Sequence, residues 1–343
     1  VTLRLAADPE RTAARARGLV ELAFRLAGLP EDNPFVHHLM VDFADHDGEW
    51  LVTSLAAAPG SSLPFWSEPG LERLLTEHFI AYSRKGTSLQ LLDIVQQAEI
   101  AYEHLRQLRL PLAPRYLVHA VPARRFQELA GTPQAIGLAM ARYALVDGRM
   151  RVDSRAMFLN GALFDEAGRW RFTYDARDET LRHELVHLAF YDRTRPLTPQ
   201  WLVEGVAEYF SGAVSPAATQ ALGRALAGGA PGLSLARLSG ARSLAHGGGA
   251  EAQYLFAGHA VAFLVERFGM AGLVRFYDGF TALDHDPALS LRLERRPLRG
   301  GPGAYDQTAR RQATAEVARE TLGVELAALD RELGEWIRAA PLR

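Results

Sequence analysis

The chain of 343 residues contains no cysteine, and this absence excludes several kinds of chemistry. Without thiols, the protein cannot form disulfides, bind a metal ion through thiolates or use a cysteine nucleophile. The formal net charge is only −2, and charged residues make up 23% of the chain. Composition therefore indicates no nucleic-acid partner.

Long apolar runs are also missing. No run reaches the ~18–20 residues of a membrane-spanning helix, and the apolar stretch 135–146 is interrupted by Arg142. We therefore expect no transmembrane segment. The chain begins with Val1 rather than Met. From this we expect that an N-terminal segment is removed and that the protein is extracytoplasmic, either secreted or at the cell surface. The sequence indicates no oligomeric state.

The most informative feature that is present is the sequence His183-Glu184-Leu185-Val186-His187. On a helix, residues four apart lie on the same face. Both imidazoles can then bind one metal ion, and Glu184 lies beside that ion. This arrangement is typical of zinc hydrolases.

A catalytic zinc ion usually has three protein ligands and an open position for water, so two histidines leave one ligand to be found. The segment Trp201-Leu202-Val203-Glu204-Gly205-Val206-Ala207-Glu208-Tyr209 supplies it. The sixteen residues of 188–203 leave room for the first helix to end and a second to return. We expect Thr198 to cap this second helix, with Pro199 at its first position. Glu204 is the expected third ligand, and Glu208, one turn later, is the expected hydrogen-bond acceptor for a ligating histidine.

These two segments, HELVH and WLVEGVAEYF, resemble the gluzincin metallopeptidases, and most of all the bacterial peptidase MA-like group, which is similar to thermolysin and to aminopeptidase catalytic domains. The resemblance covers roughly residues 78–338. It implies one Zn²⁺ per chain bound by His183, His187 and Glu204, with Glu184 as general base. It further implies hydrolysis of peptide or protein substrates through a zinc-bound water. The Gly-Ala-Met-Glu-Asn segment of the aminopeptidases is missing, which favours an endopeptidase.

Enzymes of this type also need a donor that stabilises negative charge on the substrate carbonyl oxygen. In the related aminopeptidases the donor is a tyrosine on a later helix, and Tyr254 opens such a helix here. The other interpretation of Tyr254 is a core aromatic residue beside Phe256. His246 and His259 are weaker alternatives for the same catalytic role.

The sequence is also compatible with two other functions. The first is a catalytically silent module on the same zinc-containing fold, which would bind a peptide or a protein. The presence of Glu184 argues against it, since a structural zinc site typically has four protein ligands and no use for a base. The second is zinc-dependent hydrolysis of a bond other than a peptide bond.

The predicted fold class is α+β. We expect a short N-terminal α+β unit at 1–66, with a helix from Asp8 to Ala27 and a hairpin through Asp47-Gly48. A linker follows at 67–77 within a Pro- and Gly-rich region, and 78–343 forms the gluzincin-like domain. That domain is expected to begin with a small mixed sheet, to continue with the zinc helix and to end in a helical half. One of the strands 136–146 and 149–159 is expected to bind extended substrate.

Overall fold

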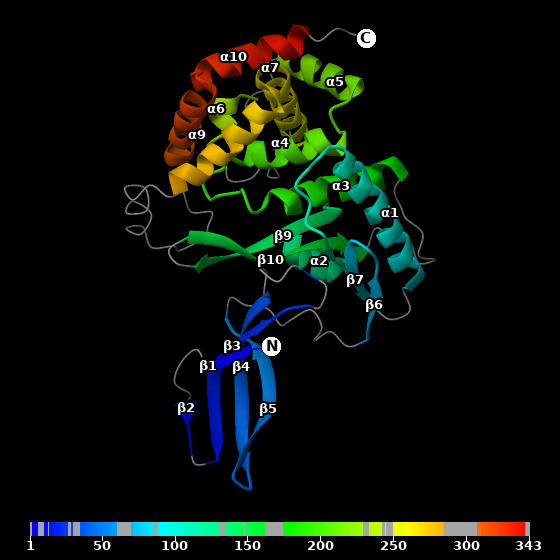
Figure 1. Ribbon diagram of the computed structural model, residues 1–343, viewed down its shortest axis with the longest axis vertical. Coiled ribbons are helices and arrows are strands. Elements are labelled where there is room, and N and C mark those ends of the chain that lie inside the picture. The colour runs from blue at the N-terminus through cyan, green and yellow to red at the C-terminus, as the bar shows by residue number, and fades with distance from the viewer. Residues whose placement is uncertain are drawn as a thin grey trace. The chain divides into compact units, whose positions relative to one another are not determined.

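The protein is described by a computed structural model, which is mixed α+β with two small sheets (Figure 1). By their contacts, the residues divide into two compact units, Val1–Glu99 with Ala113–Phe172 and Ile100–Leu112 with Thr173–Arg343. The described residues are 2–5, 10–12, 14–26, 29, 35–59, 70–84, 88–130, 135–146, 149–161, 174–228, 233–241, 244, 250–284 and 307–339.

The N-terminal sheet is antiparallel, with the order β1-β3-β4-β5, and β2 pairs with β3. Its strands are β1 (Thr2–Leu5), β2 (Glu10–Arg11), β3 (Arg15–Phe24), β4 (Phe35–His46) and β5 (Glu49–Ala57). The hairpin between β4 and β5 is confirmed, and it turns at Asp47 and Gly48, both of which have positive φ.

The helix predicted from Asp8 to Ala27 is wrong, because its central part is strand β3. Along β3, Gly18 and Val20 are buried, whereas Arg15 and Arg17 are exposed. This alternation has the period of two that a strand requires. The N-terminal unit was predicted to be α+β, but its secondary structure is strand alone within the described residues 2–59.

The second sheet is mixed, as the sequence predicts, and its order is β6-β7-β8-β10-β9. Strand β8 is parallel to both β7 and β10, while the β6–β7 and β10–β9 pairs are antiparallel. The strands are β6 (Leu71–Leu75), β7 (Phe79–Arg84), β8 (Tyr116–Val121), β9 (Gly137–Val146) and β10 (Arg149–Asn160). Of the two strands predicted to bind substrate, β9 is the one at the sheet edge in the described part of the chain.

The compact units differ from the predicted domain boundaries. Strand β6 lies inside the range 67–77 that was expected to be a linker, and residues 60–69 fall outside the described residues. The mixed sheet belongs to the same unit as the N-terminal strands. Within that unit, Phe24 at the end of β3 packs with Ile80, Leu117 and Ala156 of the mixed sheet.

Two helices lie between strands of the mixed sheet in the sequence, and the remaining helices follow its last strand. Helix α1 (Ser88–Gln107) connects β7 to β8, and α2 (Ala123–Ala130) follows β8. The second unit continues with α3 (Tyr174–Phe190), α4 (Gln200–Ser211), α5 (Pro216–Ala227), α6 (Leu235–Leu238), α7 (Ala250–Asp284), α9 (Gln307–Leu322) and α10 (Leu326–Ala339). Within this unit α4 contacts α3, α6 and α7, and α7 in turn contacts α5, α9 and α10 (Figure 1).

Helix α7 contains an internal break at Gly269, whose φ of 70° and ψ of 170° are not helical. The sequence predicts this break, since Gly269 separates two apolar helical segments. Among the described residues, Glu251–Leu283 is the one helical segment long and apolar enough to cross a membrane by length and composition, and 50% of its most apolar window is buried inside the fold. The absence of a transmembrane segment therefore stays a prediction.

Candidate metal centre

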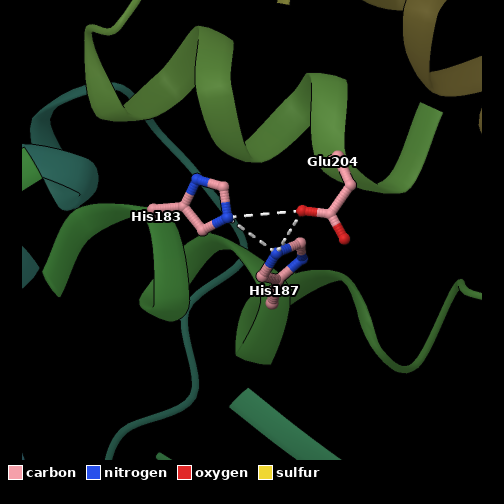
Figure 2. A group of neighbouring side chains, drawn as sticks. All are labelled: His183, His187 and Glu204. Atoms are coloured by element: carbon pink, nitrogen blue, oxygen red, sulfur yellow. Dashed lines mark hydrogen bonds and ion pairs between the residues drawn. The ribbon is translucent and has the colours of Figure 1, made fainter. Parts of the chain in front are cut away.

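Helices α3 and α4 pack against each other and bring three potential metal ligands together. His183 and His187 lie one turn apart on α3, and Glu204 lies on α4. The Nε2 atoms of the two histidines are 3.0 Å apart. Glu204 Oε2 lies 3.2 Å from His187 Nε2 and 3.4 Å from His183 Nε2. Figure 2 shows one oxygen of Glu204 facing both rings, while the other points away.

The three side chains fit a metal ion. Two imidazole nitrogens and a carboxylate oxygen are a common donor set for zinc, which lies about 2.0–2.2 Å from each such atom. Tetrahedral geometry at that radius separates the donors by about 3.3 Å, close to the three distances above. The side chains of His183, His187 and Glu204 are only 17%, 10% and 12% exposed. The residues therefore form a possible metal-binding triad.

Glu208 of α4 lies beside the ring of His183. His183 donates from Nδ1 to Glu208 Oε1 across 3.1 Å. A proton held on Nδ1 leaves the lone pair of Nε2 for a metal ion. Glu208 thus orients the His183 ring and favours a proton on Nδ1.

Replacing Glu208 with Ala is expected to weaken zinc affinity by about 10–100-fold, the usual effect of losing a hydrogen-bond partner of a metal ligand. Zinc affinity can be measured by competition with a chromophoric chelator. Glu208→Gln is the matched control, because its amide oxygen still accepts a hydrogen bond from Nδ1. Equal losses in Glu204→Ala and Glu208→Ala would contradict the separate roles of the two carboxylates.

The charges and hydrogen bonds of the cluster shift the pKa values of His183 and Glu204. Burial disfavours the charged form of His183, but hydrogen bonds to Glu204 and Glu208 outweigh it and raise the pKa of His183 well above 6.5. Burial likewise opposes ionisation of Glu204. The charge of His187 and hydrogen bonds from both histidines nevertheless hold the pKa of Glu204 well below its usual value. A metal ion bound here would replace the proton on His183 Nε2 and would itself neutralise the charge of Glu204.

Glu184 lies between the two histidines on α3 and is buried, with 7% of its surface exposed. Tyr254 lies in the first turns of α7, and its ring centroid is 6.5 Å from that of His183. Burial, followed by the negative charges of Glu204, Glu208 and Glu184, raises the pKa of Tyr254. Its phenol is therefore protonated at neutral pH and able to donate a hydrogen bond.

Two glycines let α7 approach α4 closely enough to place Tyr254 beside the triad. A Cβ on Gly205 of α4 would lie 2.5 Å from the carbonyl oxygen of Ala257. A Cβ on Gly258 of α7 would lie 2.8 Å from the Cβ of Glu208. Any larger residue at either position would push the helices apart. Gly258, one helical turn after Tyr254, thus has a packing role next to the site.

His259 is held in the helical core by two hydrogen bonds. It is fully buried, its Nδ1 donates to the carbonyl oxygen of Leu255 at 2.6 Å, and its Nε2 lies 2.8 Å from the hydroxyl of Thr219. Burial lowers the pKa of His259, which suits a neutral ring that links α7 to α5. This arrangement gives His259 a structural role. His246, the other weaker alternative, lies outside the described residues.

The loop between α3 and α4 is held by side chains that the sequence did not assign. Arg193 Nη1 donates to both carboxylate oxygens of Asp278, at 2.8 and 2.9 Å. The Thr194 hydroxyl lies 2.8 Å from that of Tyr277. These contacts tie the loop to the second half of α7.

The predicted cap of α4 is wrong. Pro199 is the N-cap residue and makes no side-chain hydrogen bond to the helix. The hydroxyl of Thr198 instead accepts from the backbone N–H of Arg195 at 2.9 Å. Thr198 thus stabilises the turn before the helix, and the helix begins at Gln200.

Gln200 is a residue of the site that the sequence analysis did not identify. Its side-chain amide donates to Glu204 Oε1 across 2.6 Å. The spacing of four residues on one helix was visible in the sequence and places the two side chains on one face. The spacing alone does not indicate which neighbour of Glu204 forms a hydrogen bond with it.

Comparisons of the chain with known protein families, with curated proteins and with solved structures find no match.

Proposed function

We propose that the protein is a zinc-dependent metallopeptidase. The observation that carries this proposal is the convergence of His183, His187 and Glu204, with Glu184 in the same helical turn as the two histidines and buried. A structural zinc site typically uses four protein ligands, whereas three potential ligands meet here among the described residues. The resemblance to gluzincins supports the same function but rests on two short segments.

The residues around the triad can perform the proton transfers of peptide hydrolysis. Zinc in such a site supplies a Lewis acid that makes a water molecule acidic enough to act as a nucleophile near neutral pH. Glu184 accepts the proton of that water as it attacks the peptide carbonyl, and then delivers the proton to the leaving amine. The neutral phenol of Tyr254 donates to the carbonyl oxygen as negative charge develops there. Glu208 keeps His183 in its ligating tautomer.

Tyr254→Phe is expected to lower kcat by about 10²–10³-fold and to change KM much less. The hydroxyl donates mainly to charge that exists in the transition state, so its loss is felt in turnover rather than in substrate binding. Steady-state kinetics on a fluorogenic peptide measures both constants. Zinc content should be unchanged in this variant, because Tyr254 is not part of the triad. A variant with the kcat of the parent protein would assign Tyr254 to the core.

A digest of casein and of a peptide library, with and without chelator, tests the function itself. A metallopeptidase cleaves without chelator, stops when the metal is removed and recovers on addition of zinc. Internal cleavage sites would identify an endopeptidase, and stepwise loss of terminal residues an exopeptidase. No cleavage by zinc-loaded protein would instead favour the silent binding module or hydrolysis of a non-peptide bond. Peptide binding without cleavage would point to the module.

A further inference from the structure

The two oxygens of the Glu204 carboxylate face different partners. Oε1 accepts a hydrogen bond of 2.6 Å from the side-chain amide of Gln200. Oε2 faces the Nε2 atoms of His187 and His183 at 3.2 and 3.4 Å. Both Gln200 and Glu204 lie in the first turns of α4, so the helix itself holds this pair in register. Figure 2 shows one of the two oxygens directed at the two rings.

This division bears on how a metal ion would be bound. A carboxylate can bind an ion through one oxygen or through both. Binding through both would use a coordination position that a catalytic site has to keep for water. A donor bound to Oε1 stabilises that oxygen where it is and opposes rotation of the carboxylate toward two-oxygen binding. Since the Glu204 side chain is only 12% exposed, solvent does not readily replace a lost donor.

The chemistry of the donor also suits the role. A lysine or arginine at this place would neutralise the carboxylate and compete with the metal ion for its charge. The amide of Gln200 is neutral and has donors but no formal charge. It therefore orients Glu204 and leaves the negative charge for the ion.

We propose that Gln200 is a positioning residue of the metal site, which holds Glu204 so that it binds a metal ion through Oε2 alone. This rests on the proposed function insofar as it requires a metal ion at the triad. It goes beyond that function by assigning a coordination mode and a residue that determines it.

The test compares the protein with its Gln200→Met variant, which keeps a side chain of similar length but has no donor. Zinc affinity is measured by chelator competition, and the visible absorption spectrum of the Co²⁺-substituted protein reports the coordination number. We expect Gln200→Met to bind zinc about 10–100-fold more weakly. We also expect weaker Co²⁺ absorption, because added carboxylate coordination moves the ion away from tetrahedral geometry. Gln220→Met is the matched control, since Gln220 is exposed on α5, and it should match the parent protein in both measurements.

Gln200→Ala provides a second variant in case the methionine packs poorly, and thermal unfolding of both metal-free variants checks that they fold. Zinc affinity and a Co²⁺ spectrum equal to those of the parent in either folded variant would overturn the role of Gln200 but leave the proposed function standing. A parent protein that takes up neither metal would overturn both. A loss of zinc affinity with a changed Co²⁺ spectrum supports the proposal. A loss of zinc affinity with an unchanged spectrum would contradict it, because Gln200 would then not determine how many oxygens of Glu204 bind the ion.

Discussion

Glu184→Gln is expected to abolish most hydrolysis while the protein keeps its fold and its zinc. Glutamine has nearly the same shape as glutamate, so the buried position is filled as before. Its amide cannot accept a proton from water, and removal of a general base typically costs about 10²–10⁴-fold in rate. The loss is expected at the upper end of this range, because Glu184 serves in both proton transfers.

Turnover of a fluorogenic peptide and metal analysis of the same preparation measure the two halves of this prediction. Glu251→Gln is a suitable control, since Glu251 lies exposed at the start of α7 and its conversion to an amide should change neither quantity. If Glu184→Gln turned over at the rate of the parent protein, the mechanism would be wrong and the binding module would become the better proposal.

His187→Ala is expected to lose most of the bound zinc, which should be close to one equivalent in protein purified without chelator. The imidazole is one of three potential protein ligands, and an ion left with two ligands should be bound too weakly to stay with the protein during purification. Removal of the ring also takes away a positive partner of Glu204. Of the interactions that lower the pKa of Glu204, the charge of His187 has the largest effect.

Metal analysis by mass spectrometry after gel filtration measures the zinc content. His46→Ala serves as the control, because the His46 side chain is 75% exposed and should have no effect on metal. Full zinc content in His187→Ala would mean that the ligand assignment is wrong. A variant that lost zinc and also unfolded would be compared with metal-free parent protein, so that loss of the ligand can be separated from loss of the fold.

The sequence was sufficient for those parts of the fold that depend on local patterns. The hairpin through Asp47-Gly48 and the two strands expected at 136–146 and 149–159 form close to where the sequence predicts. Local hydrophobic periodicity and glycine breaks determine such elements. The helix predicted from Asp8 to Ala27 failed for a physical reason. Residues 15–24 are rich in Ala, Leu, Arg and Glu, which favour helices, but pairing with β1 and β4 and burial of alternate side chains outweighed that preference.

By itself, the sequence determined which side chains can make a metal site. The spacing of His183 and His187 on one helix places their rings on one face wherever that helix lies, and the same holds for Gln200, Glu204 and Glu208 on α4. Only the tertiary structure decided which atoms face one another. The contact of Glu208 with His183 Nδ1 requires α3 and α4 to pack in one register. The approach of Tyr254 requires α7 to pack against α4 through Gly205 and Gly258. Such contacts between distant segments depend on shape and burial across helices, which local sequence patterns do not contain.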